Sequence, residues 1–314
     1  MKLGIDMGGM SIKMGLVNEE NKIIGRITIP TDLTVPYQTL VERMADAVRQ
    51  MLENAGMTLE QCGGIGIGSP GTIDAKQGVI LYSNNFGWEN VPIVEELKKH
   101  LDTRIEIAND ADAAALGEVC AGAAEGAENA VLLTLGTGVG SGVILDKKIF
   151  RGAMPGGCEL GHLSIRYDGI RCTCGRKGCL EAYASASALL RIAREKAAEH
   201  PESIMNEMCG NDLEQMNGKI PFDAAKAGDE AGMETVKEYE GYLACGIANV
   251  INTFRPEKVI LGGGVAAQKE NLTAPLKDLV KDMCFGGSHG YIADIVTSAL
   301  GNDAGIIGAA NLVV

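Results

Sequence analysis

Apolar positions follow two different rhythms along this chain. Three apolar-rich runs predict three consecutive strands near the start: "KLGID" and "IKMGLV", which are separated by the turn "MGGMS", and then "KIIGRITI". Between Tyr37 and Asn54 the apolar residues return every three or four positions, which predicts an amphipathic helix. A buried strand follows at Gly63–Gly71, and residues 92–101 predict a short helix.

The strand–glycine turn–strand pattern then occurs a second time. "AVLLTLGTGVGSGVIL" (130–145) has the same shape as the opening, and the strand before it runs into a helix at "ANDADAAALGEV". Helices are expected from Ser185 to His200, over 231–254 and over 302–312, while the polar stretch 205–219 predicts an irregular surface excursion. Two related α/β domains that face one another are therefore expected.

Charge and composition restrict the classes of function. The 314 residues carry a formal net charge of -13, which disfavours nucleic acid and anionic membranes as partners. No stretch reaches the roughly 18 uninterrupted apolar residues of a membrane span, and the N-terminus lacks the apolar core of a signal peptide. The nine cysteines do not follow a disulfide framework, so we expect a protein of the reducing cytoplasm with free thiols.

The glycine-rich turns are candidate anion sites. Glycine lets backbone N–H groups approach phosphate closely, and the turns at 6–11, 136–142 and 261–266 each offer this. Neither of the first two turns matches a Walker A or dinucleotide fingerprint, and tight hairpins remain an alternative for both. The third cluster is expected to end a strand and start a helix, which suits close approach of a nucleotide. Asp6 at the mouth of the first turn suits a Mg²⁺ ion that also binds phosphate.

Asp110 is the candidate general base. It follows a predicted strand and opens a predicted helix, a position from which a carboxylate can reach a substrate hydroxyl. Helix capping is the alternative, because Asn and Asp at a helix start are ordinary N-caps.

The segment 156–183 contains a metal-binding pattern. Cys172, Cys174 and Cys179 form C-x-C-x4-C with glycines between them, and His162 lies ten residues upstream of the first cysteine. Three thiolates and one imidazole make a closed tetrahedral set for a structural Zn²⁺. Within this segment, Glu159 and Glu181 flank the set of His162 and the three cysteines and could accept hydrogen bonds from sugar hydroxyls, with solvated surface charge as the alternative. Trp88, the single tryptophan, could stack on a ligand or belong to the core.

These motifs together resemble the ROK family of repressors and sugar kinases across essentially the whole chain. The resemblance rests on "GIDMGGMSIKMGLV", "GIGSPGTID", "NFGW", "ANDADAAALGE", "LGTGVGSGVIL", "GGCELGHLSI", "CTCGRKGCLEAYAS" and "LGGGV". It implies an α/β fold of two actin-like (ribonuclease H-like) ATPase domains with an interdomain cleft and a zinc knuckle. The expected domains are 1–110, with the helix over about 302–314 packed on it, and 111–301, with the zinc-binding loop 156–183.

The resemblance also implies roles for individual residues. Asp110 is expected as the catalytic base, with Asn85, Asn109, Glu159, His162 and Glu181 as sugar contacts; Asn84 replaces Asn85 if the register shifts by one. His162 is expected to serve both metal and sugar, so zinc loss should damage sugar affinity before ATP affinity. The expected nucleotide positions are Asp6, Gly8, Gly9, Ser11, Lys13, Thr137, Gly138 and Gly263. Met10 departs from the threonine that the family usually has in the first turn.

The function implied is ATP-dependent phosphorylation of a hexose at its 6-hydroxyl, with glucose as the expected substrate. Kinases of N-acetylglucosamine, N-acetylmannosamine and other hexoses share these motifs and stay open as alternatives. A non-catalytic sugar-sensing protein is a remote alternative, and a repressor would need a DNA-binding segment before Asp6. ATP, Mg²⁺ and structural Zn²⁺ are the expected cofactors, and a homodimer or dimer of dimers is expected.

Overall fold

The computed structural model describes residues 1–287, 289 and 292–313, and these form two compact units. The first unit contains Met1–Leu132, Gly142–Cys158 and Ala299–Val314. The second unit contains Leu133–Ser141 and Glu159–Ser298. The α/β class predicted from the sequence is confirmed. The domain division predicted after Asp110 stays a prediction.

A five-stranded sheet forms the centre of the first unit. Its order is β3-β2-β1-β4-β8, with bounds Ile23–Pro30, Ser11–Val17, Lys2–Met7, Ile65–Ser69 and Ile105–Asn109. The pairs β1–β2 and β2–β3 are antiparallel, whereas β1–β4 and β4–β8 are parallel. The carboxyl ends of the parallel strands β1, β4 and β8 therefore meet at one edge, and Asp6 and Asn109 lie there.

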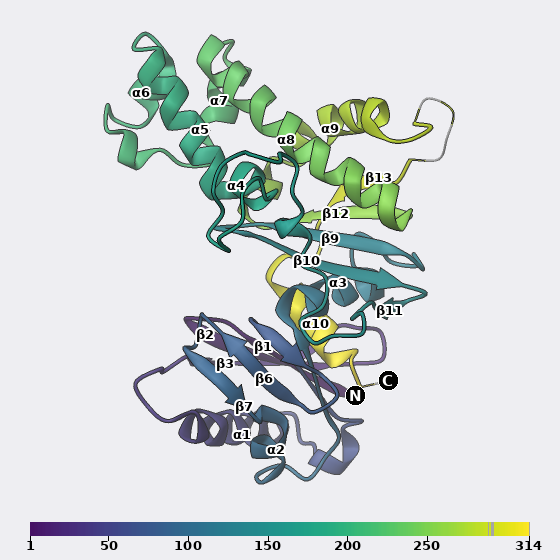
Figure 1. Ribbon diagram of the computed structural model, residues 1–314. Coiled ribbons are helices and arrows are strands. Elements are labelled where there is room, and N and C mark those ends of the chain that lie inside the picture. The colour runs from purple at the N-terminus through teal and green to yellow at the C-terminus, as the bar shows by residue number, and fades with distance from the viewer. Residues whose placement is uncertain (288, 290–291, 314) are drawn as a thin grey trace. The chain divides into compact units, whose positions relative to one another are not determined.

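Helices cover both faces of this sheet (Figure 1). Helices α1 (Tyr37–Asn54) and α2 (Ile93–Lys98) lie on one face, and α3 (Asp110–Ala121) and α10 (Ala304–Ala310) lie on the other. The predicted period of α1 is confirmed, since its buried residues recur at three- and four-residue intervals. The C-terminal helix is shorter than the expected 302–314, and Val314 lies outside the described residues.

Close backbone packing joins α10 to the sheet. A Cβ on Gly66 of β4 would lie 1.7 Å from the carbonyl oxygen of Ala309 in α10. Glycine is therefore required at this position for α10 to lie directly on the strand.

A small antiparallel sheet in the first unit consists of β5 (Thr72–Asp74), β6 (Val79–Ser83) and β7 (Trp88–Val91). Trp88 packs against Phe86, with ring centroids 4.8 Å apart, and against Tyr37, at 6.1 Å. It belongs to the edge of the hydrophobic core, so the core alternative for Trp88 is the one that the structure supports.

A second five-stranded sheet has the order β11-β10-β9-β12-β13. The bounds are Lys148–Ile149, Val139–Leu145, Ala130–Leu135, Lys258–Gly262 and Asp294–Thr297. Strands β12 and β13 are parallel, and β10 and β11 are antiparallel. The turn between β9 and β10 is the second glycine turn predicted from the sequence.

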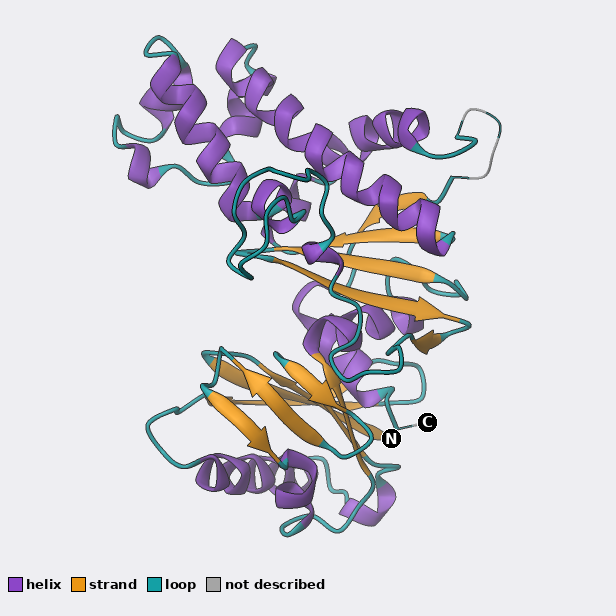
Figure 2. Ribbon diagram, viewed as in Figure 1, coloured by secondary structure: helices purple, strands orange, loops and turns teal. Residues whose placement is uncertain are grey.

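The helices of the second unit gather on one side of its strands (Figure 2). They are α4 (Glu181–Ala184), α5 (Ala186–Glu199), α6 (Ile204–Met208), α7 (Ile220–Lys226), α8 (Glu230–Phe254) and α9 (Glu270–Met283), with 3-10 turns at Leu160–His162, Leu213–Gln215 and Gly264–Gln268. Among the described residues, none of the helices has the length and apolar character needed to span a membrane.

The stretch 205–219 corrects one expectation. It was predicted to be an irregular surface excursion, but it contains the end of α6 and a 3-10 turn. Met205, Cys209 and Met216 are buried in a small core of their own with residues of α5 and α7. The apolar positions are spaced too widely for the prediction to have recognised them as one buried face.

Candidate functional site

Asp110 lies where β8 ends and α3 begins. The helix cap is supplied by its neighbour: Asn109 Oδ1 accepts hydrogen bonds from Ala111 N at 2.9 Å and Asp112 N at 3.4 Å. Asn109 Nδ2 also donates to the Gly71 carbonyl at 3.1 Å. The capping role considered for Asp110 thus belongs to Asn109, and the Asp110 carboxyl is the first side chain of the helix.

Two carboxyl groups and one amine share this edge of the sheet. Burial raises the pKa of Asp110 above its ordinary value, against the lowering effect of the Ala111 N–H group. Burial also raises the pKa of Asp6, while the charge of Lys13 lowers it and the charge of Asp110 raises it. Asp6 faces Lys13 across the β1–β2 pair. This arrangement offers a proton acceptor in Asp110 and a cation ligand in Asp6.

The first glycine turn joins β1 to β2 next to Asp6 and Lys13. Gly8 N donates to Ser11 O at 3.0 Å, and Thr31 Oγ1 donates to Gly8 O at 2.6 Å. An added Cβ on Gly9 would lie 3.8 Å from Asn85 Nδ2, so Asn85 lies close to this turn. The Met10 side chain is 91% exposed and leaves the turn backbone clear.

The cavity beside Asn109 was not predicted from the sequence. Its volume is about 170 Å³, and the charged residues lining it are Asp74, Lys76, Asp112 and Arg151. Residues 152–157 line the cavity as well; they overlap the start of the zinc-binding loop 156–183, called the cysteine loop below. These residues lie in separate stretches of the chain with no shared motif, so no pattern in the sequence could have grouped them.

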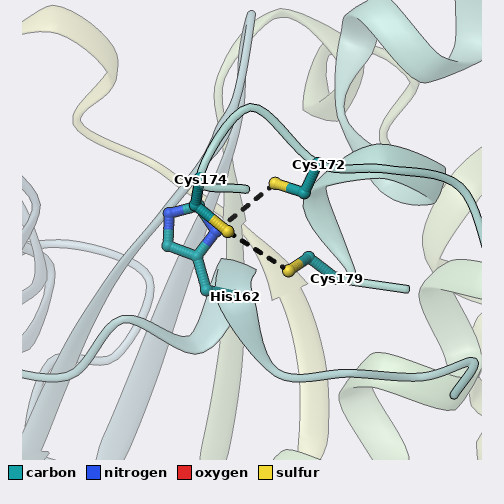
Figure 3. Close-up of side chains that lie close together, drawn as sticks. All are labelled: His162, Cys172, Cys174 and Cys179. Atoms are coloured by element: carbon teal, nitrogen blue, oxygen red, sulfur yellow. Dashed lines mark hydrogen bonds between the residues drawn. The ribbon is translucent and has the colours of Figure 1, made fainter. Parts of the chain in front are cut away.

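In the second unit the structure gathers the predicted zinc ligands (Figure 3). The ligand atoms of His162, Cys172, Cys174 and Cys179 all lie within 4.8 Å of one another. Cys174 Sγ and Cys179 Sγ are 3.6 Å apart, and Cys172 Sγ is 3.7 Å from His162 Nδ1. In a tetrahedral site with Zn–S bonds of about 2.3 Å, neighbouring ligand atoms lie about 3.8 Å apart. The four side chains therefore fit zinc.

Two of the three thiols are hard to ionise unless a cation is bound. Burial raises the pKa of the Cys179 thiol to about 12 and also raises the pKa of Cys172. At Cys174 the N–H of Arg176 lowers the pKa. Three adjacent thiolates need a compensating charge, which a divalent metal supplies.

Glu181, Glu159 and Gly263 belong to the second unit with this cluster. Glu181 opens α4, two residues after Cys179, and its carboxylate accepts a hydrogen bond from Val139 N in the second glycine turn at 3.1 Å. Glu159 precedes the 3-10 turn that carries His162. Gly263 lies at the end of β12 with φ of 81°, and a Cβ there would lie 2.5 Å from Leu135 O.

The predicted site residues therefore fall into two sets. The first unit holds Asp6, Gly8, Gly9, Ser11, Lys13, Asn85, Asn109 and Asp110. The second unit holds Thr137, Gly138, Glu159, His162, Cys172, Cys174, Cys179, Glu181 and Gly263. Within each unit, some of these residues lie close together although they are far apart in the sequence. The catalytic and binding roles of these residues stay predictions.

Comparison with known proteins identifies relatives over the full length. The family model "ROK family" matches residues 2–314. A glucokinase of Thermotoga maritima is 37% identical over 312 residues, covering 99% of this chain and 96% of the relative. A glucokinase of Halalkalibacterium halodurans is 35% identical, covering 99% and 94%. A ROK family glucokinase from Streptomyces griseus, solved with glucose and AMPPNP, has a TM-score of 0.80 at 32% identity, covering 99% and 98%.

Proposed function

The chain belongs to the ROK family, and we propose that it transfers the γ-phosphoryl group of ATP to the 6-hydroxyl of glucose. The protein is an ATP-dependent hexose kinase, a class supported by glucokinase relatives at 32–37% identity over nearly the whole chain. The solved relative with glucose and AMPPNP supports a sugar and ATP as the two substrates.

The observation that carries the mechanism is the partly buried Asp110 carboxyl at the first position of α3, directly after β8. A hydroxyl oxygen becomes a nucleophile when a base takes its proton as the O–P bond forms, and a raised pKa makes Asp110 a better proton acceptor. Asn109 stabilises the start of α3: its side chain caps the helix and donates a hydrogen bond to the Gly71 carbonyl. Asp110 Oδ1 also accepts a hydrogen bond from Ala111 N at 2.9 Å, which holds the carboxylate at the start of the helix.

The remaining steps concern charge. In-line phosphoryl transfer depends on positioning and on electrostatic stabilisation of the phosphate oxygens. Backbone N–H groups of the glycine turns and Lys13 would bind these oxygens, and Asp6 would hold Mg²⁺, which neutralises phosphate charge when bound. His162, Cys172, Cys174 and Cys179 would hold Zn²⁺, which stabilises the loop and leaves no ligand position for water.

A second substrate class, N-acetylhexosamines, has support from one structural feature. The 170 Å³ cavity next to Asn109 includes the apolar side chains of Ile73 and Met154, which could receive an acetamido methyl group. A solved Listeria monocytogenes protein described as a putative N-acetylmannosamine kinase is 25% identical with a TM-score of 0.78. The homodimer or dimer of dimers, and the location in the cytoplasm, stay predictions.

A coupled assay of ADP release over a sugar panel tests the proposal. Glucose, mannose, allose, N-acetylglucosamine and N-acetylmannosamine are compared by kcat/KM, and glucose is expected to be the best substrate. An N-acetylhexosamine with the highest kcat/KM would select the second class. If no hexose is turned over, the protein is not a hexose kinase. The non-catalytic alternative would then need sugar binding without turnover.

A further inference from the structure

Glu181 connects two segments of the second unit that are far apart in the sequence. Its Oε2 accepts the N–H of Val139 in the glycine turn at 3.1 Å. Its Oε1 accepts a hydrogen bond from the hydroxyl of Thr173, which lies between two of the metal-ligand cysteines, at 3.2 Å, and it also lies 3.5 Å from Cys172 Sγ. The carboxylate is thus a bridge between the cysteine loop and the turn that joins β9 to β10.

The turn is shaped to receive this carboxylate. A Cβ on Gly138 would lie 2.3 Å from Glu181 Oε2, so a side chain at position 138 would displace the glutamate. Nearby residues hold the same turn: Ala186 N donates to Gly136 O at 2.8 Å, and Ser187 Oγ donates to Thr137 O at 3.0 Å. The start of α5 and Glu181 therefore fix opposite ends of the turn.

The bonding pattern leaves specific donors free. Val139 N–H is taken by Glu181, whereas within the described part of the chain the N–H groups of Thr137 and Gly138 donate to no protein acceptor. Two adjacent free N–H groups in a fixed turn are suited to phosphate oxygens. Their direction depends on how the turn is held at Val139.

We propose that Glu181 is a positioning residue for the nucleotide: it holds the turn 136–142 in the conformation that presents the Thr137 and Gly138 N–H groups to phosphate, and Thr173 relays the position of the cysteine loop to it. This inference rests on the proposed function for the identity of the ligand. It differs from the sugar-contact role expected for Glu181, since it assigns the effect of this side chain to nucleotide affinity.

Four substitutions distinguish the effect of the two hydrogen bonds from the effect of the negative charge of Glu181. In Glu181→Gln the amide oxygen can still accept from Val139 N and the amide nitrogen can donate to Thr173 Oγ1, whereas Glu181→Ala removes both bonds. Thr173→Val removes one bond at nearly constant shape, and Thr173→Ser, which keeps the hydroxyl, is its matched control. Dissociation constants for AMPPNP with Mg²⁺ and for glucose are measured by titration calorimetry, together with zinc content.

The expected result is a graded loss of AMPPNP affinity. Glu181→Ala should weaken AMPPNP binding about tenfold, Thr173→Val about threefold, and Glu181→Gln and Thr173→Ser less than about twofold. Hydrogen exchange of the peptide containing Val139 should become faster in Glu181→Ala and Thr173→Val alone. If Glu181→Ala loses zinc, Thr173→Val decides the question, because Thr173 is not a metal ligand.

Several results would overturn the inference. They are unchanged AMPPNP affinity in Glu181→Ala or in a zinc-loaded Thr173→Val, a loss in Glu181→Gln equal to that in Glu181→Ala, or a loss confined to glucose. Failure of the proposed function looks different. The unaltered protein would then bind no AMPPNP, while faster exchange at Val139 in the variants would still report the bridge.

Discussion

Glu240 on helix α8 is an acidic residue that the fold buries. Its side chain is 6% exposed, and within the described residues its Oε1 has no hydrogen-bond partner. Burial is the cause that raises its pKa from 4.5 to about 7. A carboxylate at this position is costly, because ionisation requires hydration that the helical layer excludes.

Replacing Glu240 by glutamine should stabilise the protein increasingly as pH rises from 4.5 to about 7, with the full gain at alkaline pH. A raised folded-state pKa means that the contribution to stability is fully present below pH 4.5 and is lost as pH rises through about 7. The change from 4.5 to about 7 corresponds to about 3 kcal/mol. Glu240→Gln removes the charge with little change of shape, so it should gain up to about 3 kcal/mol over the unaltered protein at pH 8.5 and little at pH 4.5.

The assay must report on the second unit. Trp88, the single tryptophan, lies in the first unit, so its fluorescence follows the wrong part of the molecule. Scanning calorimetry at pH 4.5, 7 and 8.5, with hydrogen exchange of α8 amides, measures the relevant transition. Glu238→Gln on the same helix is the matched control, because Glu238 is exposed and its replacement removes a carboxylate that water already hydrates. A difference between Glu240→Gln and the unaltered protein that is the same at all three pH values, or none at pH 8.5, would refute the reasoning.

Three further predictions follow from the two units. Asp110→Asn should lower kcat at least about a hundredfold with sugar affinity largely kept, and kcat of the unaltered enzyme should fall as pH drops through the raised pKa of Asp110; steady-state kinetics with sugar titration checks both. Glu118, fully buried, accepts the N–H groups of Ala123, Ala299 and Leu300, so Glu118→Ala should cost about 3 kcal/mol in urea unfolding followed by Trp88 fluorescence; an unchanged midpoint would contradict this. Elemental analysis should find about one zinc per chain, lost in Cys174→Ser, and a fully active zinc-free protein would contradict a structural role.

The elements were predictable because hydrophobic period reports burial directly. The helix at Tyr37–Asn54 has the bounds that its apolar spacing predicts, and both glycine turns connect strands as expected. The zinc ligands were predictable for a different reason: three of the four lie within eight residues, so local spacing alone brings them together.

Other features depend on partners that are distant in the sequence. Glu118 belongs to the motif "ANDADAAALGE", but its carboxylate accepts hydrogen bonds from the N–H groups of Ala299 and Leu300, where the chain returns to the first unit. No local pattern in the sequence distinguishes this buried glutamate from an exposed one. The packing of Trp88 against Phe86 and Tyr37 was likewise undecidable before the small sheet was seen.

The cysteine loop is where the structure changes the expectation most. The sequence led us to expect that zinc loss would damage sugar affinity first, because His162 was expected to bind both metal and sugar. Two hydrogen bonds, from Thr173 to Glu181 and from Val139 to Glu181, also connect the loop to the turn 136–142, which we propose binds the nucleotide phosphates. Since Thr173 lies between Cys172 and Cys174, any disorder there is transmitted across two hydrogen bonds to the phosphate donors. Loss of metal should therefore weaken AMPPNP and sugar binding together, and the loop is better understood as a support shared by both substrates.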